Sequence, residues 1–161
     1  MKKYLIAATL IVFASGGATP APSGTLKQAH EYGFGDKSSL DPASRGRVMQ
    51  ITEKLMSRLI RPDMKGSPSP DLAVSWSANS QATEWTLKLR EGVKFHDGSA
   101  FDSGDVIYTF NRVLNPENKS PARSAIKMIE KMEAPDKLTV TCKLSTPFAD
   151  LPLQLMDYRL R

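Results

Sequence analysis

The spacing of apolar residues between Trp85 and Leu114 changes its period once, and this change constrains the fold more than any other feature. Residues 85–89 (WTLKL) alternate apolar and polar side chains, which is typical of a strand with one buried face. Residues 102–114 (DSGDVIYTFNRVL) carry apolar side chains three and four positions apart, which predicts an amphipathic helix. Short strands mixed with a few helices predict the α+β class.

Two carboxylates mark the start of this predicted helix. Asp102 can accept hydrogen bonds from the free amides of the first turn, and Asp105 can reach back to the amide of Asp102. Both carboxylates also lie at the positive end of the helix dipole. A capping box therefore explains the pair better than acid–base chemistry or a metal site, and Asn115-Pro116 is expected to end the helix.

The stretch GVKFHDGSAF, residues 92–101, separates the strand from the helix and contains a histidine beside an aspartate. Adjacent residues of an extended chain point to opposite faces, so His96 and Asp97 are not expected to bond each other. Asp97-Gly98 is a strong turn signal, and the flanking Phe95 and Phe101 could pack together. The stretch is predicted to be a strand end and a turn, not a catalytic pair.

The chain up to residue 89 predicts one helix and three strands. Apolar spacing predicts a helix over 46–59 that Pro62 ends, followed by a loop over 63–70. Residues 72–77 and 85–89 predict a hairpin that carries Trp76 and Trp85 on paired strands. An earlier strand is predicted over 26–34.

The segment after the helix predicts a second pair of strands. A short helical or irregular piece from Ala122 leads to strands over 128–133 and 138–144, joined by a turn over 134–137. A final short helix is expected within 147–157.

Candidate chemical groups are few. The single cysteine, Cys142, alternates with apolar residues in a predicted strand, so it is expected to be a buried apolar residue and not a nucleophile. The two histidines, His30 and His96, lie far apart, and no metal-ligand spacing, nucleophile elbow or phosphate loop is present. No metal, cofactor or catalytic residue is predicted, and an exported hydrolase using His96 would need remote partners.

The first residues have the layout of a secretory signal peptide. Lys2-Lys3 precede an apolar run over 4–14, and small residues follow, so residues 1–21 are expected to be removed near Ala18 or Ala21. The run is shorter than the roughly 20 residues that span a bilayer. No cysteine follows it, which disfavours a lipid anchor.

The charge balance gives little support for nucleic-acid binding. Without Lys2 and Lys3 the chain has 20 basic and 17 acidic residues, and the two kinds are interspersed along the sequence.

Four segments together resemble a known family. They are SLDPA (39–43), PDLAVSW (70–76), WTLKLREGVKFHDGSAFDSGDVIYTFNRVLNP (85–116) and APDKLTVTCKLSTPFADLPLQL (134–155). In this order they resemble the periplasmic solute-binding proteins of ABC importers, specifically the dipeptide-, oligopeptide- and nickel-binding family (solute-binding protein family 5). Ala100 stands where this family usually has proline, and Asp102 stands where it has a capping threonine. The residues that match the family's markers, expected to be structural, are Trp76, Gly92, Phe95, His96, Asp97, Gly98, Phe101 and Asp105.

The resemblance implies a fold and a function. Residues 22–161 would form part of the first lobe of a type II periplasmic binding protein: one strand of the ligand lobe and the small accessory subdomain, without the second lobe. Such a protein is a periplasmic monomer, not an enzyme. It captures a peptide or similar small solute, without a cofactor, for permease subunits in the inner membrane. A truncated fragment that binds no solute is the alternative.

The resemblance also implies where solute would approach. In the family, the residues just after the LDP sequence lie at the edge of the cleft. Either arginine in this stretch could pair with a peptide carboxylate, although two solvated arginines at a helix start fit the sequence equally well. The residues concerned are Ser44, Arg45, Gly46, Arg47 and Val48.

Overall fold

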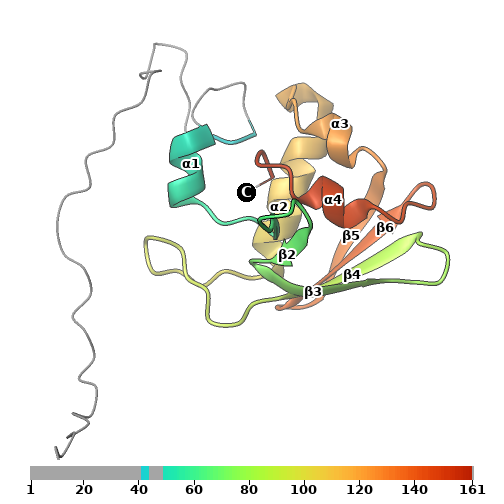
Figure 1. The fold of residues 1–161 in the computed structure, drawn as a ribbon, viewed down its shortest axis with the longest axis horizontal. Coiled ribbons are helices and arrows are strands. Elements are labelled where there is room, and N and C mark those ends of the chain that lie inside the picture. The colour runs from blue at the N-terminus through green and yellow to red at the C-terminus, as the bar shows by residue number, and fades with distance from the viewer. Residues whose placement is uncertain (1–40, 44–48, 161) are drawn as a thin grey trace, which may run out of the picture. The chain divides into compact units, whose positions relative to one another are not determined.

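A four-stranded antiparallel sheet is the largest sheet of the part that the computed structural model describes, residues 41–43 and 49–160, and helices α2, α3 and α4 lie on one side of it (Figure 1). The strand order β3-β4-β6-β5 joins two hairpins through the β4–β6 pairing. The mixture of strands and helices agrees with the predicted α+β class. The predicted signal peptide and the strand over 26–34 lie outside the described residues. The strands are β3 (Ala73–Ala78), β4 (Glu84–Leu89), β5 (Ile129–Asp136) and β6 (Thr139–Leu144).

The first hairpin confirms the prediction for residues 72–89. Trp76 lies opposite Leu87 and Ala78 lies opposite Trp85, so both tryptophans are on paired strands. Trp85, Leu87 and Leu89 are buried on one face, while Lys88 is exposed on the other. The Trp85 indole Nε1–H donates to the Phe148 carbonyl at 3.1 Å, which ties the hairpin to the chain after β6.

The second hairpin turns later than predicted. Strand β5 continues to Asp136, and the turn is confined to Lys137 and Leu138. Pro135 is tolerated because β5 is an edge strand whose register shifts between Glu133 and Asp136. The face of β6 that alternates through Cys142 is buried as expected, and burial raises the pKa of the Cys142 thiol to about 12. Cys142 is therefore a core residue, as predicted.

Helix α2 (Ser103–Leu114) contacts β5 and β6 and confirms the predicted capping box. The Asp102 carboxylate accepts from the Gly104 amide at 2.8 Å, and the Asp105 carboxylate accepts from the Asp102 amide at 2.9 Å. The buried side of the helix carries Val106, Phe110 and Val113. The helix ends at Asn115, followed by a short 3₁₀ turn, η1 (Pro116–Asn118).

The helix predicted over 46–59 ends earlier in the structure. Helix α1 (Met49–Leu55) ends before Leu59, and β1 (Ile60–Pro62) follows it. Strand β2 (Pro68–Pro70), which pairs with β1, lies where a loop was predicted over 63–70. Leu59 and Ile60 are both buried. The Leu59 carbonyl accepts from the Ala73 amide at 2.9 Å, so this part of the chain reaches the core in extended form. The helical spacing of Leu59 was therefore misleading.

Two further short helices complete the fold. Helix α3 (Arg123–Ile126) and helix α4 (Leu151–Leu155) contact each other, and α4 also contacts β1. Both fall in the segments where short helices were expected. Within the described residues, none of the helices has the length and apolar character needed to cross a membrane. Strands and helices contribute to one hydrophobic cluster, which includes Ile60, Ala73, Leu87, Phe110, Val113, Ile126, Val140, Leu151, Leu155 and Leu160.

Candidate binding site

The stretch 92–101 folds as the predicted turn. The Gly98 amide donates to the Phe95 carbonyl, and the Phe95 amide donates to the Ser99 carbonyl, both at 2.9 Å. Gly98 has a φ of +88°, a conformation that favours glycine. The Asp97 carboxylate accepts from the Ser99 hydroxyl at 2.6 Å and from the Ser99 amide at 2.9 Å. These hydrogen bonds lower the pKa of Asp97, and through them the carboxylate stabilises the turn.

The two phenylalanines that flank this turn pack edge to face. Their ring centroids lie 6.0 Å apart with an interplanar angle of 72°, an arrangement that aromatic pairs favour. Phe95 remains 45% exposed, while Phe101 is partly buried against the core. The predicted contact is therefore confirmed, and it leaves the Phe95 side chain partly accessible.

His96 makes a contact that the sequence did not reveal. Its Nε2 lies 2.9 Å from the carbonyl oxygen of Leu55, the last residue of α1 and 41 positions earlier. A carbonyl oxygen can only accept, so Nε2 must carry the hydrogen. The imidazole thus turns to Leu55 while Asp97 turns to Ser99, and the two do not act as a catalytic pair. No sequence signal marks this contact, because its acceptor is a backbone atom.

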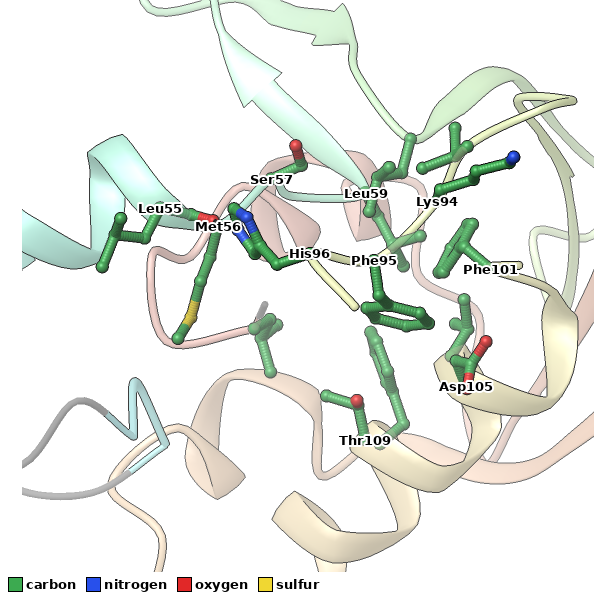
Figure 2. A pocket seen from close by; sticks show the side chains of 15 residues that line it. Leu55, Met56, Ser57, Leu59, Lys94, Phe95, His96, Phe101, Asp105 and Thr109 are labelled. Atoms are coloured by element: carbon green, nitrogen blue, oxygen red, sulfur yellow. Dashed lines mark hydrogen bonds between the residues drawn. The ribbon is translucent and has the colours of Figure 1, made fainter. Parts of the chain in front are cut away.

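An apolar pocket of about 470 Å³ lies beside the turn (Figure 2). This volume is within the range of about 300–1,000 Å³ that is common for small-molecule sites. The end of α1 and the residues after it form one wall, and the first turns of α2 form another. Figure 2 shows His96 beside Leu55 and Met56, with Asp105 and Thr109 projecting from α2. The lining includes Leu55, Met56, Leu59, Phe95, Phe101, Val106, Phe110 and Leu160.

Two charged side chains at the pocket are directed elsewhere. The Asp105 carboxylate is engaged in capping α2, and the Lys94 ammonium points away from Met56 and Thr109 in Figure 2. No cluster of three or more histidine, cysteine, aspartate or glutamate side chains that could hold a metal occurs within the described ranges 41–43 and 49–160. The lining suits an apolar group of a ligand or of another protein segment.

The predicted family markers divide between three places. Phe95, His96, Phe101 and Asp105 line the pocket. Gly92, Asp97 and Gly98 shape the turn, and Gly92 also has a positive φ, +74°. Trp76 lies on the sheet opposite Leu87. The structure thus brings four of the markers together.

The predicted solute-contact residues, Ser44, Arg45, Gly46, Arg47 and Val48, lie outside the described residues. The residues just before them are held firmly. Asp41 forms an ion pair with Arg112 of α2, which lowers the pKa of the Asp41 carboxyl. The Ser120 hydroxyl donates to the Ala43 carbonyl at 2.9 Å. Asp41 and Ala43 are therefore attached to the end of α2 and to the segment after η1.

Comparison with known proteins identifies related sequences. Residues 67–160 match the family described as bacterial extracellular solute-binding proteins, family 5 Middle. The glutathione-binding protein GsiB of Pectobacterium atrosepticum is 46% identical over 78 residues, which cover 48% of this chain and 15% of that protein. The periplasmic oligopeptide-binding protein OppA of Salmonella typhimurium is 33% identical over 136 residues, covering 78% of this chain and 25% of that protein.

A solved structure shares the fold. The binding protein AgaA of A. tumefaciens R10, in complex with agropinic acid, superposes with a TM-score of 0.69 and 34% identity. The match covers 78% of this chain and 26% of that one. The chain therefore spans about a quarter or less of the length of these relatives.

Proposed function

Since the chain belongs to the bacterial extracellular solute-binding proteins of family 5, we propose that it is the solute-binding part of an ABC importer. Relatives of this chain are binding proteins and not enzymes. The proposal rests on one observation above all: the family match extends over residues 67–160, more than half of the chain. The turn over residues 92–101, here called the marker turn, and the capped helix α2 both lie within this range.

The proposed location and architecture follow from the same relationship. Residues 1–21 would direct export and be removed, and residues 22–161 would form part of the first lobe of a type II periplasmic binding protein. The protein would act as a monomer in the periplasm and deliver its solute to permease subunits in the inner membrane. Solute would be held without any bond being made or broken.

The proposed solute is a small peptide. Glutathione and oligopeptides appear in the names of two relatives, GsiB and OppA. Peptides carry a carboxylate that an arginine guanidinium binds with two parallel hydrogen bonds. We assign this role to Arg47 or Arg45 in the proposed solute-contact segment, Ser44–Val48.

A second candidate is a fragment that keeps the fold but binds no solute. This candidate is supported by the small share of each relative that the match covers, 15% of GsiB and 25% of OppA. Part of a lobe encloses less of a ligand than two complete lobes.

Calorimetric titration with glutathione and with trialanine tests both candidates. Binding of either peptide supports the solute-binding role, and Arg47→Ala is then expected to weaken it roughly tenfold or more, because a hydrogen bond to a charged group contributes about 1.5–3 kcal/mol. Arg61→Ala, at an exposed residue of β1, is the matched control and should leave affinity unchanged. If Arg47→Ala and Arg45→Ala each bind as tightly as the parent chain, the assigned contact is contradicted. Absence of binding of either peptide favours the fragment.

A further inference from the structure

We propose that Arg58 and His96 are positioning residues that clamp the C-terminal end of helix α1 and so fix the helix that follows the solute-contact segment. The inference rests on the proposed function, because α1 directly follows the proposed solute-contact segment in the chain. Neither residue needs to touch the solute. The argument depends on two donors from different parts of the chain that meet the same end of one helix.

The first donor is His96. The last carbonyls of a helix have no partners within the helix, and the His96 Nε2–H satisfies the carbonyl of Leu55 at 2.9 Å. A histidine is also favourable at a helix C-terminus because of the negative end of the dipole. The marker turn therefore provides the external cap of α1.

The second donor is Arg58, whose side chain is only 14% exposed. Its guanidinium forms an ion pair with Glu53 of α1, and its Nη1 donates to the Met156 carbonyl at the end of α4 at 2.9 Å. The Arg58 amide also donates to the Asp71 carboxylate at 3.0 Å, just before β3. Arg58 thus joins the end of α1 to α4 and to the start of the sheet.

Helix α1 needs such contacts because its described part, Met49–Leu55, has only seven residues. Helices of this length are not stable in water without tertiary packing. Both donors act within its last turn, at Glu53 and Leu55, and Leu55 and Met56 also line the pocket. The clamp therefore determines where α1 lies against the marker turn.

Hydrogen exchange of the complete chain tests the clamp directly. His96→Ala removes the donor, and the amides of residues 53–56 are expected to exchange about fivefold faster, the factor expected for one net hydrogen bond. His96→Gln keeps an N–H donor at a similar reach and should restore protection to within about twofold. Phe101→Leu is the matched control: it disturbs the neighbouring aromatic contact and should lower the melting temperature without changing exchange in α1.

Titration with glutathione and trialanine tests the positioning role. Affinity should fall about fivefold in His96→Ala and recover in His96→Gln. Arg58→Lys should also weaken binding, because lysine lacks the planar fork of the guanidinium. Unchanged exchange in His96→Ala, or equal losses in the alanine and glutamine variants, overturns the clamp. Faster exchange with unchanged affinity overturns the positioning role. If the parent chain binds neither peptide, the proposed function fails, while the exchange result still decides the clamp.

Discussion

Asp41 and Arg112 make part of the stability of this fold depend on pH. The Arg112 hydrogen bond lowers the pKa of Asp41, so the pair stabilises the folded chain above the ordinary aspartate pKa of about 4. This contribution is lost as the pH falls through the lowered value. The Arg112 side chain is 42% exposed, so solvent screening limits the effect.

Arg112→Gln is therefore expected to lower the free energy of unfolding by about 0.2–1 kcal/mol at pH 7 and by almost nothing near pH 2.5. Urea denaturation at the two pH values measures the difference. Arg90→Gln is the matched control, since the Arg90 guanidinium donates to a backbone carbonyl, that of Asp71. A loss in Arg112→Gln that is the same at both pH values would show that the carboxylate is not responsible.

At this scale the sequence predicted the local contacts and missed the distant ones. The Asp102–Asp105 capping box and the Asp97-Gly98 turn involve residues within a few positions of one another, where spacing alone defines the geometry. The Asp41–Arg112 pair spans 71 positions, and the His96–Leu55 bond ends on a backbone atom. No local pattern encodes such contacts.

Among the elements, the loop of the β3–β4 hairpin contains one strained residue. Ala82 has a φ of +52°, a left-handed conformation that is unfavourable for residues with a Cβ atom. The loop keeps this geometry because the Ala82 amide donates to the Asn79 carbonyl at 3.0 Å, and the Ala82 carbonyl accepts from the Phe148 amide at 2.9 Å. The Asn79 side chain also accepts from the Thr83 amide at 2.9 Å.

Ala82→Gly should therefore raise the free energy of unfolding by about 0.5–1 kcal/mol, because glycine adopts this conformation without steric penalty. Urea denaturation of the parent and the variant gives the value. Ala78→Gly, at the last residue of β3, provides the opposite expectation: a loss of up to about 0.5–1 kcal/mol, because glycine has more conformational entropy to lose on folding and gains nothing at a residue that is already extended. Destabilisation by Ala82→Gly would mean that the loop does not hold the left-handed conformation in solution.

The errors in the predicted elements have a common physical origin. Pro62 was expected to end a helix, and Pro68 and Pro70 were expected to mark a loop. All three instead lie in the two-stranded sheet formed by β1 and β2, where proline is tolerated because short edge strands need few amide donors. Local residue preferences indicate that proline disfavours regular helices and strands. Whether a strand nevertheless forms depends on a partner segment elsewhere in the chain.

At the scale of the whole molecule, one hydrophobic cluster connects the sheet to its helices. Trp85 is buried in this cluster and reports on the sheet, whereas far-ultraviolet circular dichroism also reports on α2, α3 and α4. A shared core predicts that the two signals change together during urea unfolding. Trp76→Phe leaves Trp85 as the single tryptophan and makes the fluorescence specific. Two separate transitions would show that the hairpins and the helices unfold independently.

The sequence indicated the family and the α+β class because marker motifs and the periodic spacing of apolar residues can both be read from one sequence. The pocket could not be predicted in the same way. Its walls come from the end of α1, the 92–101 turn, α2 and Leu160, and their proximity results from packing across the whole described chain.

The order β3-β4-β6-β5 also has a consequence for the kinetics of folding. Each hairpin pairs neighbouring segments, but the β4–β6 ladder joins Leu87 to Val140, about 50 positions apart, around a connection that contains α2 and α3. Closing a loop of this length loses chain entropy before the ladder forms, and contacts between distant residues slow folding. The hairpins are therefore expected to form early, and the rate of folding should be set by the meeting of β4 and β6.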